Sequence, residues 1–109
     1  MCGICGIAGR DTSRPPVHLG RLRAMTDVIR HRGPDEDGLH VEPGVALGMR
    51  RLSVIDLAGS HQPVTTEDGG VRAVFNGEIY NFAELRRDLS ARGHRLATNG
   101  DAEPIVHLY

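Results

Sequence analysis

The sequence predicts a small domain of the α+β class. Its 109 residues are enough for one domain at most. With 39% hydrophobic and 25% charged residues, the composition is typical of a globular protein. Short apolar stretches with strand-like alternation are interspersed with at least two patterns at helical spacing. Together, these observations predict that both strands and helices contribute to one fold.

The first half of the chain predicts three strands and one helix. A buried strand is expected from Cys2 to Ala8, ending at Gly9. Two further strands are expected over 38–42 and 44–56, with Pro43-Gly44 as the turn between them. An amphipathic helix between the first two strands is stopped by Gly33-Pro34; its apolar residues are Leu19, Leu22, Met25, Val28 and Ile29.

The second half predicts one strand followed by two helices. Val71 to Phe75 is apolar and is terminated by Asn76-Gly77. Asn81 and Glu84 have the spacing of a capping box at the start of a helix that ends at Gly93. Another helix is expected to begin at Asp101 and to continue to the last residue, which suggests that the chain is incomplete.

Charge and hydropathy argue against several classes of partner. All 13 basic residues are arginine, but 14 acidic residues balance them and only two Tyr and two Phe are available to stack on bases, so nucleic acid is not expected. No apolar run approaches the roughly 20 residues that span a bilayer, and no signal peptide is recognisable. We therefore expect a cytoplasmic protein without a membrane partner.

The cysteines and histidines do not predict a metal site. Cys2 and Cys5 have C-x-x-C spacing, which leaves a redox or zinc interpretation open. A closed zinc site needs four ligands, however, and no second such pair follows. Among the six histidines, His31, His61 and His94 adjoin motifs or turns, but none is paired at a spacing that suggests a metal site or a catalytic triad.

Cys2 is a candidate nucleophile because of its position. Removal of Met1 would leave Cys2 with a free α-amino group, whose pKa of about 8 lies near that of a thiol. One residue would then supply both the nucleophile and the base that activates it. The alternative interpretation is a small buried apolar cysteine, which is the commoner role.

Three other features also allow a functional and a structural interpretation. Asn76-Gly77 could build an oxyanion hole from a side-chain amide and a backbone N–H, or could simply form a turn. Arg51 could hold a carboxylate through two hydrogen bonds, or could lie at the surface. Asp101 and Glu103 could bind an ammonium group, or could cap the following helix or interact with its dipole.

Taken together, five motifs identify a resemblance to the N-terminal glutaminase domain of asparagine synthetases. They are MCGICGIAG, RHRGPDEDG, RLSVIDLAGSHQPV, VFNGEIYNFAELR and TNGDAEPIV, and they extend over essentially the whole chain. Other class II glutamine amidotransferases differ around HRGPD and NGEIYN. The resemblance implies an N-terminal-nucleophile αββα sandwich. Because family domains are considerably longer, we expect the sandwich to be incomplete in this chain, with exposed edges and marginal stability.

The resemblance also implies roles for individual residues. Cys2 would be the nucleophile, and Asn76 and Gly77 the oxyanion hole. Residues expected to bind glutamine are Arg51 at the α-carboxylate, Asp101 and Glu78 at the α-ammonium, and Leu52 and Val54 through backbone groups. This sequence has Gly100 where relatives often have serine, and Pro104 at the start of the last helix; both leave Asp101 in place.

The implied activity is hydrolysis of glutamine to glutamate and ammonia through a cysteine thioester. In the full-length enzyme, ammonia would pass to a C-terminal synthetase domain that uses ATP and magnesium to convert aspartate to asparagine. Residues 2–109 would form the first part of the glutaminase domain, which needs no metal or other cofactor. The SGGxDS loop of the synthetase domain is absent from the sequence.

Some alternatives remain open at this stage. The chain could belong to a related amide-forming synthetase, or it could be a noncatalytic fragment or binding module. We expect the isolated fragment to be inactive, and a homodimer is a further expectation for the full-length form.

Overall fold

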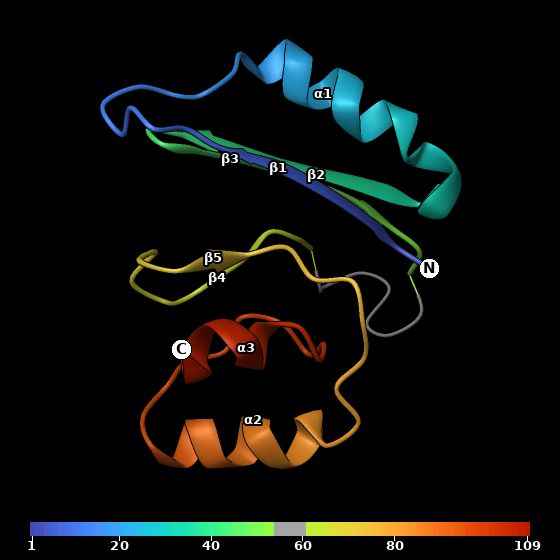
Figure 1. Ribbon diagram of the computed structural model, residues 1–109. Helices are drawn as coiled ribbons and strands as arrows, with labels where there is room; N and C mark the ends of the chain where they lie inside the picture. The colour runs from blue at the N-terminus through green and yellow to red at the C-terminus, as the bar shows by residue number, and fades with distance from the viewer. Residues whose placement is uncertain (54–60) are drawn as a thin grey trace.

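The computed structural model describes residues 1–53 and 61–109, and it confirms a mixed fold of helices and strands. The elements in chain order are β1 (Gly3–Ala8), α1 (Leu19–Val28), the 3-10 turn η1 (Arg30–Arg32), β2 (Glu36–Glu42), β3 (Val45–Arg51), β4 (Val64–Thr65), β5 (Arg72–Ala73), α2 (Phe82–Ala91) and α3 (Glu103–Leu108). Figure 1 shows α1 over one sheet, then the small β4-β5 sheet, then α3 and α2.

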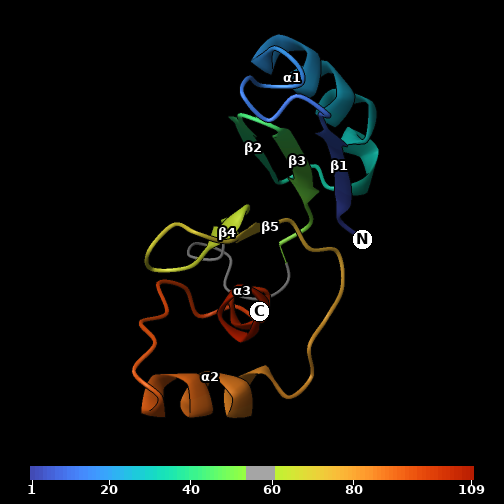
Figure 2. The same ribbon diagram turned by 60° about the vertical axis from the view of Figure 1, so that its left-hand side comes forward.

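The larger sheet is antiparallel and has the strand order β1-β3-β2 (Figure 2). The predicted turn between β2 and β3 is confirmed, and Gly44 adopts a φ of 84° there, which favours glycine. Gly3 pairs with Arg50 and Glu36 pairs with Arg51. The beginnings of β1 and β2 therefore both lie beside the end of β3, which brings Cys2 next to Arg51.

Helix α1 packs on the larger sheet and forms the first part of the core. Leu22 and Thr26 of α1 are fully buried, and Met49 of β3 is 1% exposed. The Thr26 hydroxyl donates a 2.8 Å hydrogen bond to the Leu22 carbonyl, which allows a polar side chain to be buried inside the helix–sheet interface. Leu19 and Val28, which the pattern placed on the apolar stripe, are exposed because they lie at the two ends of the helix.

The second part of the core lies between the β4-β5 sheet and α3. Val64 of β4 packs with Ala102 and Val106, and Val71, Ala73 and Phe75 cover this cluster. Leu89 of α2 is also buried. Arg72 of β5 donates a 3.0 Å hydrogen bond to Glu42 of β2, so a charged pair joins the two sheets.

Several predicted details of the second half were wrong. The strand expected over Val71–Phe75 is only Arg72–Ala73. Its partner β4 was not predicted. The Asn81 side chain makes no capping hydrogen bond, so the capping box does not form, although α2 begins directly after Asn81 as expected. In the first half, β3 ends at Arg51 rather than at 56, and residues 54–60 lie outside the described part. The strand expected to be buried over Cys2–Ala8 is β1, which lies at the edge of the larger sheet, and its Ile4 is 48% exposed.

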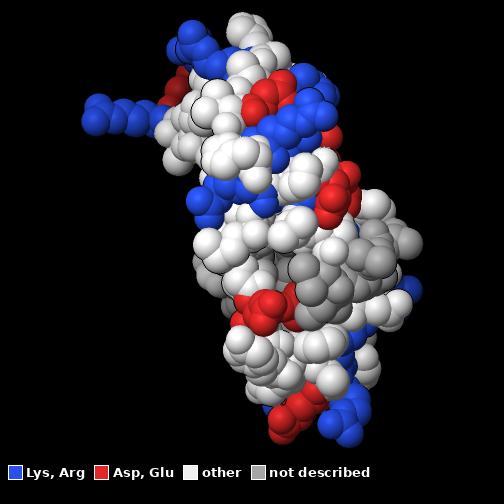
Figure 3. Space-filling view, turned by 90° about the vertical axis from the view of Figure 1, so that its right-hand side faces the viewer, with Lys and Arg blue, Asp and Glu red and all other residues white. Residues whose placement is uncertain are grey.

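Charged side chains of both signs occupy the side on which the N-terminus lies (Figure 3). Arginine atoms gather mainly over α1 and the larger sheet, with acidic atoms beside them. Among the described residues, no helix combines the length and the apolarity that crossing a membrane requires.

Candidate active site

A cavity of about 390 Å³ lies where the end of β3 meets the segment that follows β5, and its size suits a small ligand. It is lined by Met1, Cys2, Arg51, Leu52, Gln62, Phe75, Asn76, Gly77, Glu78, Tyr80, Asp101 and Ala102. The structure thus brings together every predicted site residue except Val54, which falls outside the described residues.

Cys2 is placed in the cavity by the register of the larger sheet. Because Gly3 pairs with Arg50, the residue before β1 lies beside the residues that end β3. The Leu52 backbone N–H donates to the Cys2 Sγ over 3.4 Å, and Arg32 Nε donates to the Cys2 carbonyl over 3.3 Å. Cys2 is half-buried and lines the cavity, so the interpretation as a fully buried apolar cysteine is wrong.

The two cysteines do not act as a pair. In a strand, residues at an odd separation point to opposite faces. The Cys5 Sγ accordingly contacts the Thr26 hydroxyl of α1 at 3.6 Å, whereas the Cys2 Sγ contacts Leu52. Both thiols are free. The geometry therefore contradicts a redox or zinc role for the C-x-x-C spacing.

Arg51 is a buried residue, so the alternative of a surface arginine is wrong. Only 4% of Arg51 is exposed, and its Nη1 donates to Glu36 Oε2 over 3.1 Å. Glu36 also accepts a hydrogen bond from His61 Nδ1 or donates to it, depending on protonation. A guanidinium carries five N–H donors in a rigid planar fork, a geometry that matches a carboxylate. The salt bridge orients the guanidinium at the wall of the cavity.

Asn76 and Gly77 are held at the cavity by Gln62. The Gln62 side chain accepts a 2.6 Å hydrogen bond from the Phe75 N–H and donates a 3.2 Å hydrogen bond to the Phe75 carbonyl. A Cβ on Gly77 would lie 2.7 Å from the Phe75 ring, so any larger residue here would require that ring to shift. β5 ends before this pair, which therefore is not a tight hairpin turn between strands.

Asp101 links the Asn76-Gly77 segment to the loop before α3. Its Oδ2 accepts a 2.9 Å hydrogen bond from the Ile79 N–H, and a carboxylate can accept further hydrogen bonds. α3 has no side-chain cap, so the capping interpretation of Asp101 and Glu103 is wrong, but Glu103 lies in the first turn of α3, where the helix dipole favours a carboxylate. Glu103 is buried, which by itself would raise its pKa, but hydrogen bonds from Thr98 and from the Ala97 N–H lower the pKa.

Sequence reasoning missed part of the cavity wall. It gave no role to Gln62, Phe75 or Tyr80, although all three stand within quoted motifs. Gln62 is separated from Phe75 by 13 positions, and only the folded hairpin brings the two together. A glutamine that precedes a proline carries no general signal of such a contact.

The charges of the cavity match those of an α-amino acid. Arg51 supplies one cationic group, and Glu78 and Asp101 supply two carboxylates. Such an arrangement can bind a carboxylate at one end and an ammonium at the other. The thiol of Cys2 stands in the same cavity, where it can meet the side chain of a ligand held in this way.

Comparison with known proteins agrees with this chemistry. Residues 1–109 match the family model described as a glutamine amidotransferase domain. The chain is 41% identical over 112 residues to asparagine synthetase [glutamine-hydrolyzing] 2 of Bacillus subtilis (strain 168). It is 39% identical over 110 residues to asparagine synthetase [glutamine-hydrolyzing] 1 of the same organism, and 39% identical over 109 residues to asparagine synthetase [glutamine-hydrolyzing] 1 of Arabidopsis thaliana.

These matches cover the whole of this chain but only a small part of each relative. The shares of the three relatives are 14%, 17% and 18% of their lengths. The match therefore concerns one region of longer proteins. Because the family model covers all 109 residues, and the cavity gathers the residues that the resemblance singled out, the chain belongs to the glutamine amidotransferase domain family.

Proposed function

We propose that this chain provides the glutamine-hydrolysing site of a glutamine-dependent asparagine synthetase. The observation that carries the proposal is the single cavity that joins Cys2, Arg51, Asp101 and the Asn76-Gly77 pair. These residues come from four separate stretches of sequence, and a merely structural role for each would not require them to share one cavity. The printed names of the relatives support glutamine as the substrate.

Glutamine would bind through its α-carbon substituents. The Arg51 guanidinium, oriented by Glu36, holds the α-carboxylate, and the carboxylates of Glu78 and Asp101 hold the α-ammonium. Backbone groups of Leu52, and of Val54 as inferred from the resemblance, complete the contacts. The side-chain amide of the substrate is then presented to the Cys2 sulfur, which makes the attack effectively intramolecular.

The first chemical step uses only Cys2 and the oxyanion hole. After removal of Met1, the α-amino group of Cys2 accepts the thiol proton, and the thiolate forms a bond to the amide carbon of glutamine. The Asn76 side-chain amide and the Gly77 backbone N–H donate hydrogen bonds to the oxygen that becomes negative. The carbon–nitrogen bond then breaks, and the α-ammonium returns the proton to the leaving nitrogen, which departs as ammonia.

The second step regenerates the enzyme. Water, deprotonated by the α-amino group, adds to the γ-glutamyl thioester; the carbon–sulfur bond breaks and glutamate leaves. The proton held by the amine then returns to the Cys2 sulfur. All groups in both steps belong to the substrate, to water or to this chain, so this half-reaction needs no cofactor.

We further propose that residues 2–109 are the first part of an N-terminal-nucleophile αββα domain. The order of helix, sheet, sheet and helices in Figure 1 supports this arrangement. The small share of each relative that the chain matches supports a longer parent protein. In that parent, ammonia passes to a synthetase domain. This domain uses ATP and magnesium to convert aspartate to asparagine. We also propose that the parent is cytoplasmic and forms a homodimer.

The proposal is tested by labelling Cys2 with an electrophilic glutamine analogue, such as the amino acid in which a diazoketone group stands in place of the side-chain amide of glutamine. In the full-length parent with Met1 removed, we expect one adduct on the Cys2 peptide by mass spectrometry, and excess glutamine should prevent it. Cys5→Ala, as the matched control, should be labelled like the unchanged chain, and Cys2→Ala should not be labelled. Labelling that glutamine does not compete, or an adduct on Cys5, would refute the proposed site.

Cys5→Ala should affect stability and not catalysis. The Cys5 Sγ packs against Thr26 under α1, on the face of β1 opposite to the cavity. Loss of this half-buried sulfur should lower the free energy of unfolding by about 0.5 to 2 kcal/mol. Urea denaturation measures the loss, and the glutaminase rate of the full-length parent should be unchanged. A large fall in that rate with the fold intact would revive a role for paired cysteines.

A further inference from the structure

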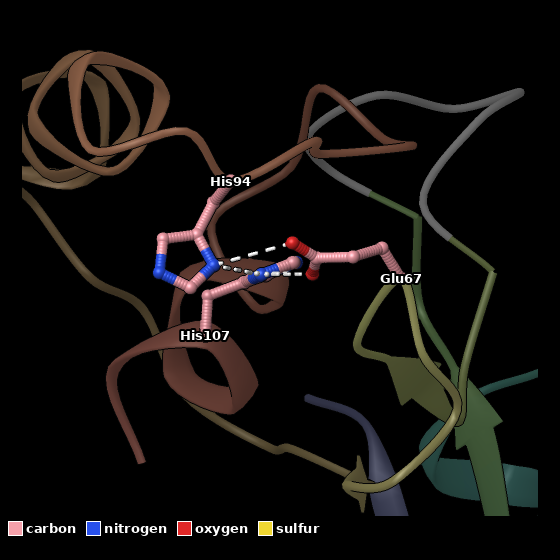
Figure 4. A group of neighbouring side chains, drawn as sticks. All are labelled: Glu67, His94 and His107. Atoms are coloured by element: carbon pink, nitrogen blue, oxygen red, sulfur yellow. Dashed lines mark hydrogen bonds and ion pairs between the residues drawn. The ribbon is translucent and has the colours of Figure 1, made fainter.

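Outside the proposed active site, Glu67, His94 and His107 form a compact group, here called the His-Glu cluster. Glu67 follows β4, His94 follows α2 and His107 lies in α3. Figure 4 shows their side chains pointing toward one another from these three elements. No member of the cluster lines the cavity that holds Cys2. The topology therefore brings together a second set of chemically active side chains that the proposed hydrolysis does not use.

The spacing of the ligand atoms fits a small transition-metal ion. The two Nδ1 atoms of His94 and His107 are 3.2 Å apart, and His107 Nδ1 lies 2.9 Å from Glu67 Oε2. His94 Nδ1 lies 3.4 Å from Glu67 Oε1. In a tetrahedral zinc site with bonds of about 2.0 to 2.1 Å, ligand atoms are roughly 3.3 Å apart. Glu67 faces the two rings with a different oxygen each, and the ligand atoms that the three residues offer all lie within 4.8 Å of one another.

The surroundings of His107 favour ligation through its Nδ1. The His107 side chain is fully buried, and its Nε2 has no hydrogen-bond partner among the residues that the structure describes. Nε2 nevertheless lies 3.5 Å from Oε1 of the buried Glu103. A carboxylate on the far nitrogen of a histidine stabilises the proton there and leaves the other nitrogen as a ligand, as is usual around protein-bound zinc.

We propose that the His-Glu cluster binds one divalent transition-metal ion, with zinc as the expected occupant. Two imidazoles and one carboxylate suit Zn²⁺, and the same donors also bind other ions of this class. The side chains of His94 and Glu67 are 35% and 30% exposed, so a fourth ligand can come from solvent. The ion would link the segment after β4, the segment after α2 and helix α3. It would thereby stabilise the half of the molecule that contains β4, β5, α2 and α3.

The sequence concealed this cluster because its spacing matches no short motif. His94 and His107 are 13 positions apart, and Glu67 lies in a different segment. No pair of histidines at a metal-binding spacing is therefore recognisable in the sequence. In the folded chain the C-terminal end of α2 faces α3, and the two rings approach at a centroid distance of 5.2 Å.

The test is a Zn²⁺ titration of the metal-stripped 109-residue chain, purified without a histidine tag. Calorimetry should show one equivalent of Zn²⁺ bound, and Co²⁺ in its place should give the visible absorption of a four- or five-coordinate nitrogen and oxygen site. His94→Ala and Glu67→Gln change partly exposed side chains, and each should weaken binding at least about a hundredfold. Glu103→Gln should weaken it about ten- to a hundredfold.

The controls separate the cluster from other ligands. His31→Ala, which changes an exposed histidine of η1, should bind Zn²⁺ like the unchanged chain. Cys2→Ser and Cys5→Ala should also bind normally, and a sulfur-to-cobalt charge-transfer band should be absent. Zinc binding that survives His94→Ala, that is lost in Cys2→Ser, or that does not reach one equivalent would overturn the proposal and leave the His-Glu cluster as an ion-pair network.

Discussion

Cys2→Ala in the full-length parent is expected to lower glutamine-dependent synthesis by more than about a thousandfold. The sulfur is the only group that the proposed mechanism can use to form the thioester, so no neighbouring residue can replace it. Synthesis from added ammonium salt should persist, because ammonia enters after the step that needs Cys2. The measurement compares the two rates of asparagine formation in the same preparation, with glutamate release as the direct readout of hydrolysis.

Cys2→Ser sharpens this test because it preserves the size of the side chain and the α-amino group. A serine hydroxyl is far less acidic than a thiol and is a weaker nucleophile, so the α-amino group activates it much less readily, and this variant should also lose most of its activity with glutamine. Retained glutamine-dependent activity in either variant would exclude Cys2 as the nucleophile. Loss of the ammonia-dependent rate as well would point to misfolding.

The parts of the fold that sequence predicted well are those with local signals. A run of glycine and apolar residues predicts β1, apolar alternation predicts β2 and β3, and Pro43-Gly44 marks the turn between the last two. β4 has only two residues, which is too short for any periodic pattern. Val71 to Phe75 is apolar enough for a strand, but the ladder ends at Ala73, and Gln62 takes the Phe75 backbone groups instead.

Helix faces and caps depended on tertiary contacts that the sequence does not display. Thr26 is fully buried in α1 although it is polar, because its hydroxyl is satisfied by the Leu22 carbonyl. Val28 is apolar but exposed, because the helix ends there. At α2, the backbone of Asn81 accepts the first helical hydrogen bonds, while its side chain makes no capping bond.

The candidate site could be named from sequence motifs, but its physical character could not. Nothing local distinguishes Arg50 from Arg51, which are adjacent and both arginine. The pleat of β3 sends them to opposite faces: Arg50 pairs with Asp27 of α1, while Arg51 pairs with Glu36 and lines the cavity. Only the β2-β3 register shows that Arg51 is buried beside a carboxylate that orients it.

Arg51→Ala is expected to raise the KM for glutamine and to lower glutaminase kcat/KM by roughly tenfold to more than a hundredfold. Loss of a charge-assisted hydrogen-bonding partner costs about 1.5 to 3 kcal/mol, and each 1.4 kcal/mol or so is a factor of ten. Arg51→Lys should restore little, because an ammonium cannot reproduce the two-pronged contact. Steady-state glutaminase kinetics of the full-length parent measure both effects, and ammonia-dependent synthesis should be spared.

Burial of Arg51 adds a structural cost that a matched variant can separate from binding. Arg51→Ala leaves the largely buried Glu36 without this partner, so some loss of stability is expected in addition to the loss of affinity. Arg50→Ala removes a similarly buried arginine from the neighbouring position of β3, but on the face toward α1. It should therefore destabilise the domain without changing the KM for glutamine. If Arg50→Ala raised the KM as much as Arg51→Ala does, Arg51 would be a structural residue, and the proposed carboxylate contact would fail.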